Sequence, residues 1–411
     1  MVKVYLVLSL LLLTAFFCLA DTENDALYNF IQFESFFHNL AGAKGQTFFP
    51  LLNIPFGGRI TGMGEAFSAV SDDIGALEAN PAGTAFITQS QLLLNHTKLI
   101  ADTNFDAIAY MNRIKNIGFG GATKILYLPF QKFDQWGDNQ GTGIISYGVF
   151  TGNFSYALFR NYYFDGLGIG TNVKVYYYYV PDEIAADQNS VNVAFDIGLL
   201  TRLNFLKFYI ANEKNFSLSF VTKNIGPPVK EEWPPTTFIT GFSYKPISQL
   251  LLAFDVSHTL FELWSDNPNT YVPLFEFRFG LEYKVVSFFS IQSGFILKDN
   301  PSFSIGVSFD LKHFSLQTTY NPDFSDVSKF NVSGIINFGD NGRADLRKKL
   351  DKIYFNGLEY FNQGEYIIAM EKFSLILKYD RQYIPAKKWF LLSKRQVELK
   401  ERLKKAVQET F

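Results

Sequence analysis

Residues 275–282 read FEFRFGLE, and apolar side chains in this stretch alternate strictly with polar or small ones. Successive side chains of a β-strand point to opposite faces, so the run has one apolar and one polar face. The same period of two recurs in residues 303–310 (FSIGVSFD), 314–320 and 330–338 (FNVSGIINF). Because such runs recur from about residue 91 to residue 339, this part of the chain is predicted to be all-β.

Further runs of strand character bring the number of candidates to about 15, and they lie near residues 91–99, 104–112, 115–128, 141–150, 152–160, 166–180, 190–203, 214–224, 236–245, 248–257 and 286–298. Turn-forming residues separate them, for example Gly152-Asn153 between two of the runs. Glycines at 166, 168 and 170 lie inside one run, where they predict a kink or a bulge.

Two architectures can use strands of this kind. A soluble sandwich buries the apolar face inside, whereas a transmembrane barrel turns that face to lipid and keeps a polar lumen. Several runs exceed the 5–6 residues usual in soluble sheets, and a membrane-spanning strand needs about 9–11. Bacterial barrels have even strand numbers, so one of the candidates is expected to be wrong. We therefore predict an all-β transmembrane barrel of about 14 antiparallel strands over residues 91–339.

The composition agrees with a membrane barrel and argues against other classes of protein. Aromatic residues reach 17% of the 411 residues, which fits aromatic girdles at the two membrane surfaces, although codon bias is an alternative cause. The densest cluster, Tyr176 to Tyr179, is either part of a girdle or an ordinary strand end. A net charge of −2 gives no basic surplus, so a nucleic-acid partner is not expected.

The first 20 residues, MVKVYLVLSLLLLTAFFCLA, have the pattern of a secretory signal peptide. Lys3 supplies the positive charge, an apolar segment follows, and Ala20 ends the stretch with a small residue. A short signal anchor and lipidation of Cys18, the only cysteine, are the alternatives. No other apolar stretch reaches the length of a membrane-spanning helix. The chain is therefore expected to be exported.

Residues 58–86 read GRITGMGEAFSAVSDDIGALEANPAGTAF and contain the spacing G-x-G-x-A-x-x-A-x-x-D-D-x6-N-P-A-G. A dinucleotide site is not expected, because Phe67 stands where the third glycine of that fingerprint is needed. The pair Asp72-Asp73 could hold calcium or serve as an acid pair, but a solvated or capping role is the simpler interpretation.

This segment resembles the plug of FadL-type outer-membrane transporters for long-chain fatty acids. The residues that match are Gly62, Gly64, Ala66, Ala69, Asp72, Asp73, Asn80, Pro81, Ala82 and Gly83. The resemblance implies a 14-stranded barrel whose lumen holds a hatch, here predicted over residues 21–90. It also implies a ligand that enters from outside, meets a hydrophobic pocket and leaves when the hatch shifts.

Two more stretches resemble the PorV branch of FadL-like proteins. One is Leu94-Asn95-His96-Thr97 followed by Ile100-Ala101-Asp102, and the other is Asn224-Ile225-Gly226-Pro227 followed by Pro235-Thr236 and by Gly241 and Tyr244. The chain as a whole is most similar to an uncharacterised FadL-like family of spirochaetes. The segment before the hatch and most loops depart from classical FadL.

Residues 24–42 carry apolar side chains that are candidates for lining a ligand pocket, namely Leu27, Phe30, Phe33, Phe36 and Phe37. Their period fits a helix with one apolar face. The alternative is that this face simply fills the lumen.

The C-terminal residues 340–411 differ in character from the rest of the chain. Their apolar period is that of a helix, and residues 341–411 hold 16 Lys+Arg against 9 Asp+Glu. Gly357, Tyr360, Ala369 and Phe373 resemble the packing positions of a tetratricopeptide repeat, from which Asn356 departs. A single repeat cannot bury its own face, so the tail is expected either to dock a periplasmic protein or to cap the barrel.

The leading functional hypothesis is passage of hydrophobic molecules, with long-chain fatty acids as the expected ligands, across a bacterial outer membrane. The alternative is a PorV-like scaffold for secretion or surface attachment, which binds a periplasmic partner through the tail. No enzyme motif, cofactor or metal site is predicted, because no nucleophile arrangement is present and the four histidines are scattered. Outer-membrane lipid and an apolar ligand are the expected partners, with the tail in the periplasm.

Overall fold

A computed structural model describes residues 49–410 except 100–102, 134–138, 160–164, 182–188, 210–213, 230–233, 260–273, 299–300, 323–328, 340–342 and 381–382. The predicted signal peptide and the apolar segment 24–42 lie outside the described residues.

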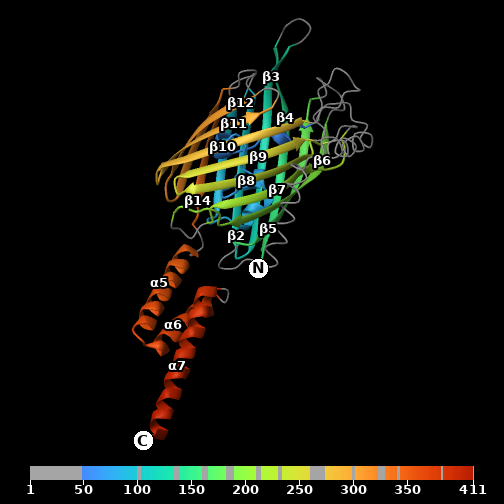
Figure 1. Ribbon diagram of the computed structural model, residues 1–411. Helices are drawn as coiled ribbons and strands as arrows, with labels where there is room; N and C mark the ends of the chain where they lie inside the picture. The colour runs from blue at the N-terminus through green and yellow to red at the C-terminus, as the bar shows by residue number, and fades with distance from the viewer. Residues whose placement is uncertain are drawn as a thin grey trace, which may run out of the picture.

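Fourteen antiparallel strands form one closed barrel, in which each strand pairs with its neighbours in sequence and β1 pairs with β14 (Figure 1). The strands are β1 (Gln91–Lys98), β2 (Asn104–Ile114), β3 (Ile117–Phe133), β4 (Asn139–Leu158), β5 (Leu167–Tyr179), β6 (Ser190–Leu203), β7 (Phe216–Ile225), β8 (Thr237–Ile247), β9 (Leu250–Thr259), β10 (Leu274–Val286), β11 (Phe289–Leu297), β12 (Ser302–Asp310), β13 (Phe314–Asn321) and β14 (Lys329–Asn337). The predicted barrel of 14 strands is confirmed.

The sequence predicts one strand too many because it predicts a turn at Gly152-Asn153. The structure shows no turn at these two residues. Residues 139–158 form the single long strand β4, and Gly152 pairs with Gly121 on β3 and with Val173 on β5. A Cβ added at Gly152 would meet no atom within 4 Å, so this position lies on the open outer face, where no close contact requires a glycine.

The apolar side chains of the strands face outward. On β10, Phe275, Phe277 and Phe279 are 38–44% exposed, whereas the alternating Glu282 is only 2% exposed. A soluble protein does not leave so large an apolar surface to water, and a closed barrel has no unpaired edge. The sandwich alternative is therefore excluded, and the chain forms an outer-membrane type of β-barrel.

The two ends of the barrel differ. We call the end where β1 begins and β14 finishes the tail end, and the opposite end the loop end. Two-residue turns close three hairpins at the tail end, those of β2–β3, β8–β9 and β10–β11. Between the described strands, no loop-end connection is as short as two residues, and the segments between β7 and β8 and between β9 and β10 are long, although β4–β5 and β6–β7 are also joined by long segments at the tail end.

Residues 49–90, here called the hatch, lie inside the barrel, where Figure 1 shows them in blue. They contain the short helices η1 (Pro50–Asn53), α3 (Gly58–Gly62), α4 (Ala76–Ala79) and η2 (Pro81–Ala85). The hatch crosses the lumen, since η2 contacts β2 to β6 while α3 contacts β11 to β14. The wall therefore holds the hatch from two opposite sides of the lumen.

Three helices follow β14, and Figure 1 shows them beyond the tail end of the barrel: α5 (Arg343–Asn362), α6 (Tyr366–Tyr379) and α7 (Ile384–Thr410). They share one apolar core around Ala369, Phe373 and Ile376, each 0% exposed. No helix among the described residues has both the length and the hydropathy needed to span a membrane.

Candidate functional site

The glycines of the hatch motif allow its backbone to approach the wall. A Cβ added to Gly64 would lie 2.7 Å from the Phe295 nitrogen and 2.9 Å from Gly294 Cα on β11. Gly64 also has a φ of +59°, a conformation that glycine adopts without strain. Gly62 ends α3 and faces Gly306 of β12 with little space between them. Gly64 is therefore restricted to glycine by close contact and conformation, and Gly62 leaves little space for a side chain.

The Asn80-Pro81-Ala82-Gly83 part of the motif attaches the hatch to the opposite side of the barrel wall. The Asn80 side chain accepts a hydrogen bond from the Ala82 nitrogen at 3.0 Å, which caps η2. Its amide group donates to Leu199 O on β6, also at 3.0 Å. Gly83 packs on Ser71 inside the hatch, where a Cβ would lie 2.6 Å from Ser71 Cβ.

Glycines on the inner face of the wall lie against this part of the motif. A Cβ on Gly170 of β5 would lie 2.3 Å from Pro81 C, and one on Gly168 would lie 2.4 Å from the Phe86 ring. β5 pairs without interruption with β4 and β6, so the predicted kink or bulge is wrong. These glycines instead leave room for the hatch.

The acid pair of the motif holds one arginine of the hatch. Arg59 makes ion pairs with Asp72 and, at 2.9 Å, with Asp73, and it reaches across to Glu282 on β10. Although its position inside the barrel raises the pKa of the Asp72 carboxyl, the adjacent Arg59 guanidinium lowers that pKa by more, to about 2. The pair is therefore part of an ionic link between hatch and wall, and no group of three or more His, Cys, Asp or Glu among the described residues could hold a metal.

Buried lysines of the wall form further links. Lys124 on β3 lies 3.0 Å from Glu78 of the hatch, and Lys223 on β7 lies 3.6 Å from the same carboxylate. Lys174 on β5 pairs with Asp196 on β6 at 2.8 Å. Burying a charge is costly unless it is paired, so the two contacts of Glu78 help to fix how the hatch sits in the lumen.

The Asn224 motif joins the β7–β8 connection to this buried network. Asn224 is 0% exposed, accepts a hydrogen bond from Lys174 Nζ at 2.8 Å and donates to Pro235 O at 3.2 Å. Its amide also donates to the Asn53 side chain of the hatch at 3.3 Å. The residues that resemble PorV therefore tie a loop to the hatch.

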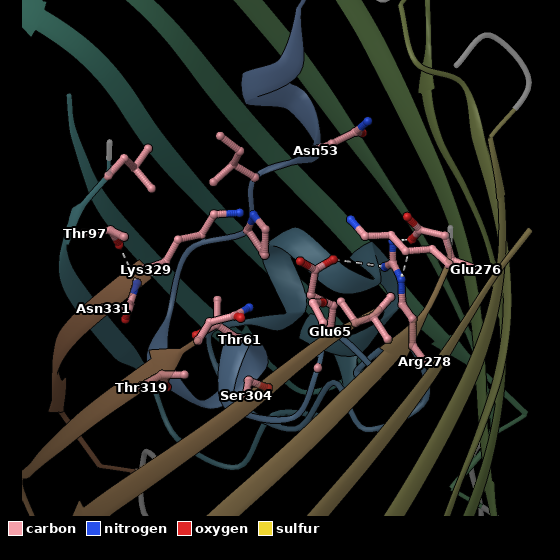
Figure 2. Close-up of a pocket in the computed structure, with 18 of the residues that line it drawn as sticks. Asn53, Thr61, Glu65, Thr97, Glu276, Arg278, Ser304, Thr319, Lys329 and Asn331 are labelled. Atoms are coloured by element: carbon pink, nitrogen blue, oxygen red, sulfur yellow. Dashed lines mark hydrogen bonds and ion pairs between the residues drawn. The ribbon is translucent and has the colours of Figure 1, made fainter. Parts of the chain in front are cut away.

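A pocket of about 220 Å³ lies on the loop-end side of the hatch (Figure 2). The hatch supplies its floor with Asn53, Ile54, Pro55, Thr61, Gly64 and Glu65. Its walls come from β1 and β9 to β14 near their loop ends, and they include Leu99, Thr259, Ile296, Lys298 and Lys329. A solute arriving from the loop end would meet this pocket before the hatch.

Charged groups occupy both sides of the pocket. Arg278 of β10 lies between two carboxylates, 3.3 Å from Glu65 of the hatch and 2.6 Å from Glu276 of its own strand. Figure 2 shows Lys329 extending from the opposite wall, beside Thr97 and Asn331. The pocket thus combines cationic groups with the apolar surfaces of Ile54, Pro55, Leu99 and Ile296.

A second cavity of about 30 Å³ adjoins the pocket. It shares Asn53, Pro55, Glu65 and Arg278 with the larger pocket and reaches Glu78 and Lys223. The volume is large enough for water. Arg278 and Lys223 therefore lie along one continuous line of cavities.

An aromatic cluster lies elsewhere in the lumen. Phe49 of the hatch packs against Tyr147 and Tyr176, with ring centroids 5.3 and 4.7 Å away, and Tyr147 stacks on Tyr178 at 4.3 Å. Only part of the Tyr176 to Tyr179 run can therefore belong to an outer girdle, since Tyr176 is 2% exposed and Tyr179 is 47% exposed. The alternation of strand side chains divides the run between the two faces.

The other predicted site residues fall in two groups. Leu27, Phe30, Phe33, Phe36 and Phe37 lie outside the described residues. Ala369 and Phe373 are buried in the tail, Tyr360 packs against them, and a Cβ on Gly357 would lie 2.8 Å from the Phe373 ring.

The sequence reasoning missed Glu65, Lys298, Lys329 and the pairing of Arg278. The available signal was a charge at an inward position of a spanning strand, which marks such residues as functional candidates. The polar face of β10 was recognised, but its partners on the hatch were not.

Comparison with known proteins identifies the family. The sequence profile of the uncharacterised protein family UPF0164 matches residues 38–339. A UPF0164 protein of Treponema pallidum (strain Nichols) is 26% identical over 372 residues, which cover 85% of this chain and 83% of that protein. A second from the same organism is 25% identical over 366 residues, covering 82% of this chain and 73% of that protein.

Solved structures with a similar fold include a deltaS2 mutant of the monoaromatic hydrocarbon channel TodX, at 11% identity and a TM-score of 0.47, covering 69% of this chain and 98% of that one. Omp33, an outer membrane protein of Acinetobacter baumannii, has 8% identity and a TM-score of 0.35, covering 61% and 98%. Identities this low concern the fold alone. The family itself follows from the profile match: this chain is a member of the uncharacterised protein family UPF0164.

Proposed function

We propose that this barrel admits hydrophobic molecules across the outer membrane, with long-chain fatty acids as the expected ligands. The observation that carries the proposal is the pocket between the hatch and the loop-end parts of β1 and β9 to β14. A barrel that only anchored a partner would not need such a pocket. Short turns at the tail end support an orientation with the tail in the periplasm and the pocket toward the cell exterior.

The lining of the pocket favours an amphiphile over a pure hydrocarbon. Arg278, Lys298 and Lys329 offer charge to an acidic head group, while Leu99 and Ile296 offer surface to an acyl chain. A hydrocarbon would displace water from these charged groups without offering them a hydrogen bond or a charge of its own, which costs free energy. A fatty acid meets both kinds of surface.

Passage needs the hatch to move, because its buried residues fill the lumen. In this proposal residues 21–90 act as the hatch, and the motif from Gly62 to Gly83 holds it closed against the wall. The side chains Leu27, Phe30, Phe33, Phe36 and Phe37 are proposed to line the apolar part of the route. Deleting residues 24–42 should then abolish or uncouple uptake.

Binding is the direct test. The mature chain is refolded in detergent, its β-content is confirmed by circular dichroism, and a fluorescent long-chain fatty acid is titrated into it. Saturable binding that unlabelled fatty acid displaces supports the proposal. A folded barrel that binds no fatty acid overturns it.

A second candidate function is a scaffold that binds a periplasmic protein through the tail. Large apolar side chains remain exposed on the tail, namely Phe355 at 66%, Ile367 at 59% and Leu391 at 56%. Together with the basic surplus of residues 341–411, they favour an acidic partner with apolar anchor residues. A pull-down that compares the full chain with one lacking residues 341–411 tests this function, and recovery of the same proteins by both would contradict it.

A further inference from the structure

The hatch and the wall carry opposite charges where they meet along the pocket. Residues 49–90 contain four acids, Glu65, Asp72, Asp73 and Glu78, and one cation, Arg59. The wall supplies Arg278 opposite Glu65, and Lys223 and Lys124 opposite Glu78. Each of these wall cations is therefore paired with a carboxylate of the hatch.

Both Arg278 and Lys223 line the cavities beside the hatch, but their hatch partners differ in exposure. The Glu65 side chain is 27% exposed and lines the larger pocket, so a solute can reach the Arg278 contact directly. Glu78 is 3% exposed, and with Lys223 it lines the adjoining smaller cavity. On the hatch side the Glu65 carboxylate is therefore the more accessible of the two, whereas the wall cations Arg278 and Lys223 are similarly exposed, at 16% and 12%.

The turn that carries Glu65 is held in an unusual conformation. Glu65 has a φ of +59°, which is unfavourable for a residue with a side chain. Its neighbour Gly64 shares this conformation and is pressed against Gly294. Backbone hydrogen bonds such as that from Glu65 N to Ile60 O, at 3.0 Å, hold this turn, and the ion pair with Arg278 adds a side-chain contact to the wall.

Building on the proposed function, we propose that a ligand carboxylate displaces Glu65 from Arg278 and Glu78 from Lys223, so that only an acidic head group releases the hatch. A ligand carboxylate replaces one ion pair with another, so Arg278 and Lys223 are never left without an anion. A neutral ligand offers no such exchange. The wall carboxylate Glu276 stays beside Arg278 throughout, 2.6 Å from it.

The test compares two ligands that differ only in the head group, radiolabelled dodecanoate and dodecan-1-ol, on the full mature chain in detergent. Folding of each variant is confirmed by heat-modifiable migration. The unaltered chain should bind dodecanoate about tenfold more tightly than the alcohol, as a charge-assisted contact predicts. Arg278→Gln should remove that preference, whereas Arg278→Lys should keep most of it.

Glu65→Gln and Glu276→Gln form a matched pair, because each removes one carboxylate from the same guanidinium. Both should strengthen dodecanoate binding several-fold. Only in Glu65→Gln should hydrogen exchange at residues 60–68 already be fast without ligand and unresponsive to dodecanoate. In Glu276→Gln and in the unaltered chain, dodecanoate should accelerate that exchange and dodecan-1-ol should not.

The outcomes separate this inference from the proposed function. Saturable binding of both ligands with equal affinity, or equal acceleration of exchange by both, overturns the carboxylate exchange and leaves the transport proposal standing. A folded barrel that binds neither ligand overturns the proposed function itself. If Arg278→Gln does not fold, the paired glutamate variants decide, since an unchanged affinity for dodecanoate in Glu65→Gln contradicts the exchange.

Discussion

Ser68 of the hatch donates both its backbone N–H and its hydroxyl to the Asp255 carboxylate of β9, at 2.9 and 2.8 Å. The Phe67 nitrogen adds a third hydrogen bond to the same carboxylate at 3.1 Å. Gly241 on β8 makes room for this contact, because a Cβ there would overlap the Asp255 carboxylate and the Ser68 hydroxyl. One wall carboxylate thus holds two successive backbone amides of the hatch.

Asp255→Asn should loosen the hatch at residues 67–68 while the barrel stays folded. An asparagine has one acceptor oxygen and places an NH2 group where N–H donors now point, so hydrogen bonds to a charged acceptor are lost. We expect the protection of these amides to fall by about 2–3 kcal/mol, measured by hydrogen exchange. Asp310→Asn, at the exposed end of β12, is the control and should leave that protection unchanged. Equal effects of the two variants would contradict the role of Asp255.

A disulfide between hatch and wall should block passage reversibly. The Ser68 and Ser219 hydroxyls lie 2.7 Å apart, so cysteines at these positions are close enough to bond. The oxidised variant Ser68→Cys/Ser219→Cys should show no fatty-acid uptake in proteoliposomes, and dithiothreitol should restore it.

The control crosslink joins two wall strands instead. Thr237 and Thr259 pair directly between β8 and β9, with hydroxyls 3.1 Å apart. Oxidised Thr237→Cys/Thr259→Cys should retain uptake, because no part of the hatch is tied. Uptake that survives oxidation at Ser68 and Ser219 would show that this part of the hatch does not move.

Gly170→Ala should weaken the docking of the hatch, whereas Gly152→Ala should not. The added methyl group at Gly170 would lie 2.3 Å from Pro81 C, and at Gly152 it would meet nothing within 4 Å. Overpacking of this kind costs about 1–3 kcal/mol. Thermal unfolding of the two variants in detergent measures the difference, and similar melting temperatures would contradict the close-approach role of Gly170.

The strands were predictable because their pattern is local. Phe275, Glu276 and Phe277 alternate within a few residues, and alternation alone determines which side chains face lipid and which face the lumen. Gly152-Asn153 was misread because the same dipeptide suits a turn and an open position in a long strand. Local sequence does not separate these two cases.

The site was only partly predictable, since its contacts join residues that are far apart in the sequence. The motif from Gly62 to Gly83 marked the hatch through resemblance, but nothing near Gly170 indicates that Pro81 will pack on it. Likewise no spacing in the sequence pairs Glu65 with Arg278, because the closure of the barrel brings them together.

Phe373→Ala should unfold the helical tail without affecting the barrel, whereas Phe355→Ala should leave the stability of the tail unchanged. Phe373 is 0% exposed at the centre of the tail core, and Phe355 is 66% exposed. Removing a buried phenylalanine costs about 3–5 kcal/mol, which a core of three helices cannot absorb. Protease sensitivity of residues 343–410 reports on the tail, and heat-modifiable migration reports on the barrel. A protease-resistant tail in Phe373→Ala would contradict the packing described for α5 to α7.

Acidification should loosen the hatch at Glu78. Burial raises the pKa of this carboxyl, but Lys124 and Lys223 lower it by more, so the docked pKa lies below its ordinary value of 4.5. A carboxyl with a depressed pKa stabilises the docked state fully above its ordinary pKa and loses that contribution as the pH falls through the docked value. Hydrogen exchange of residues 76–79, corrected for the intrinsic pH dependence, should therefore be constant from about pH 7 to 5 and rise below about pH 4. The Glu78→Gln variant has no carboxylate to protonate at this position. The difference in protection between the unaltered chain and this variant should therefore shrink over the same acidic range. A difference between the two chains that stays constant down to pH 3 would mean that the Glu78 carboxylate contributes no charge-dependent stability to the docked hatch.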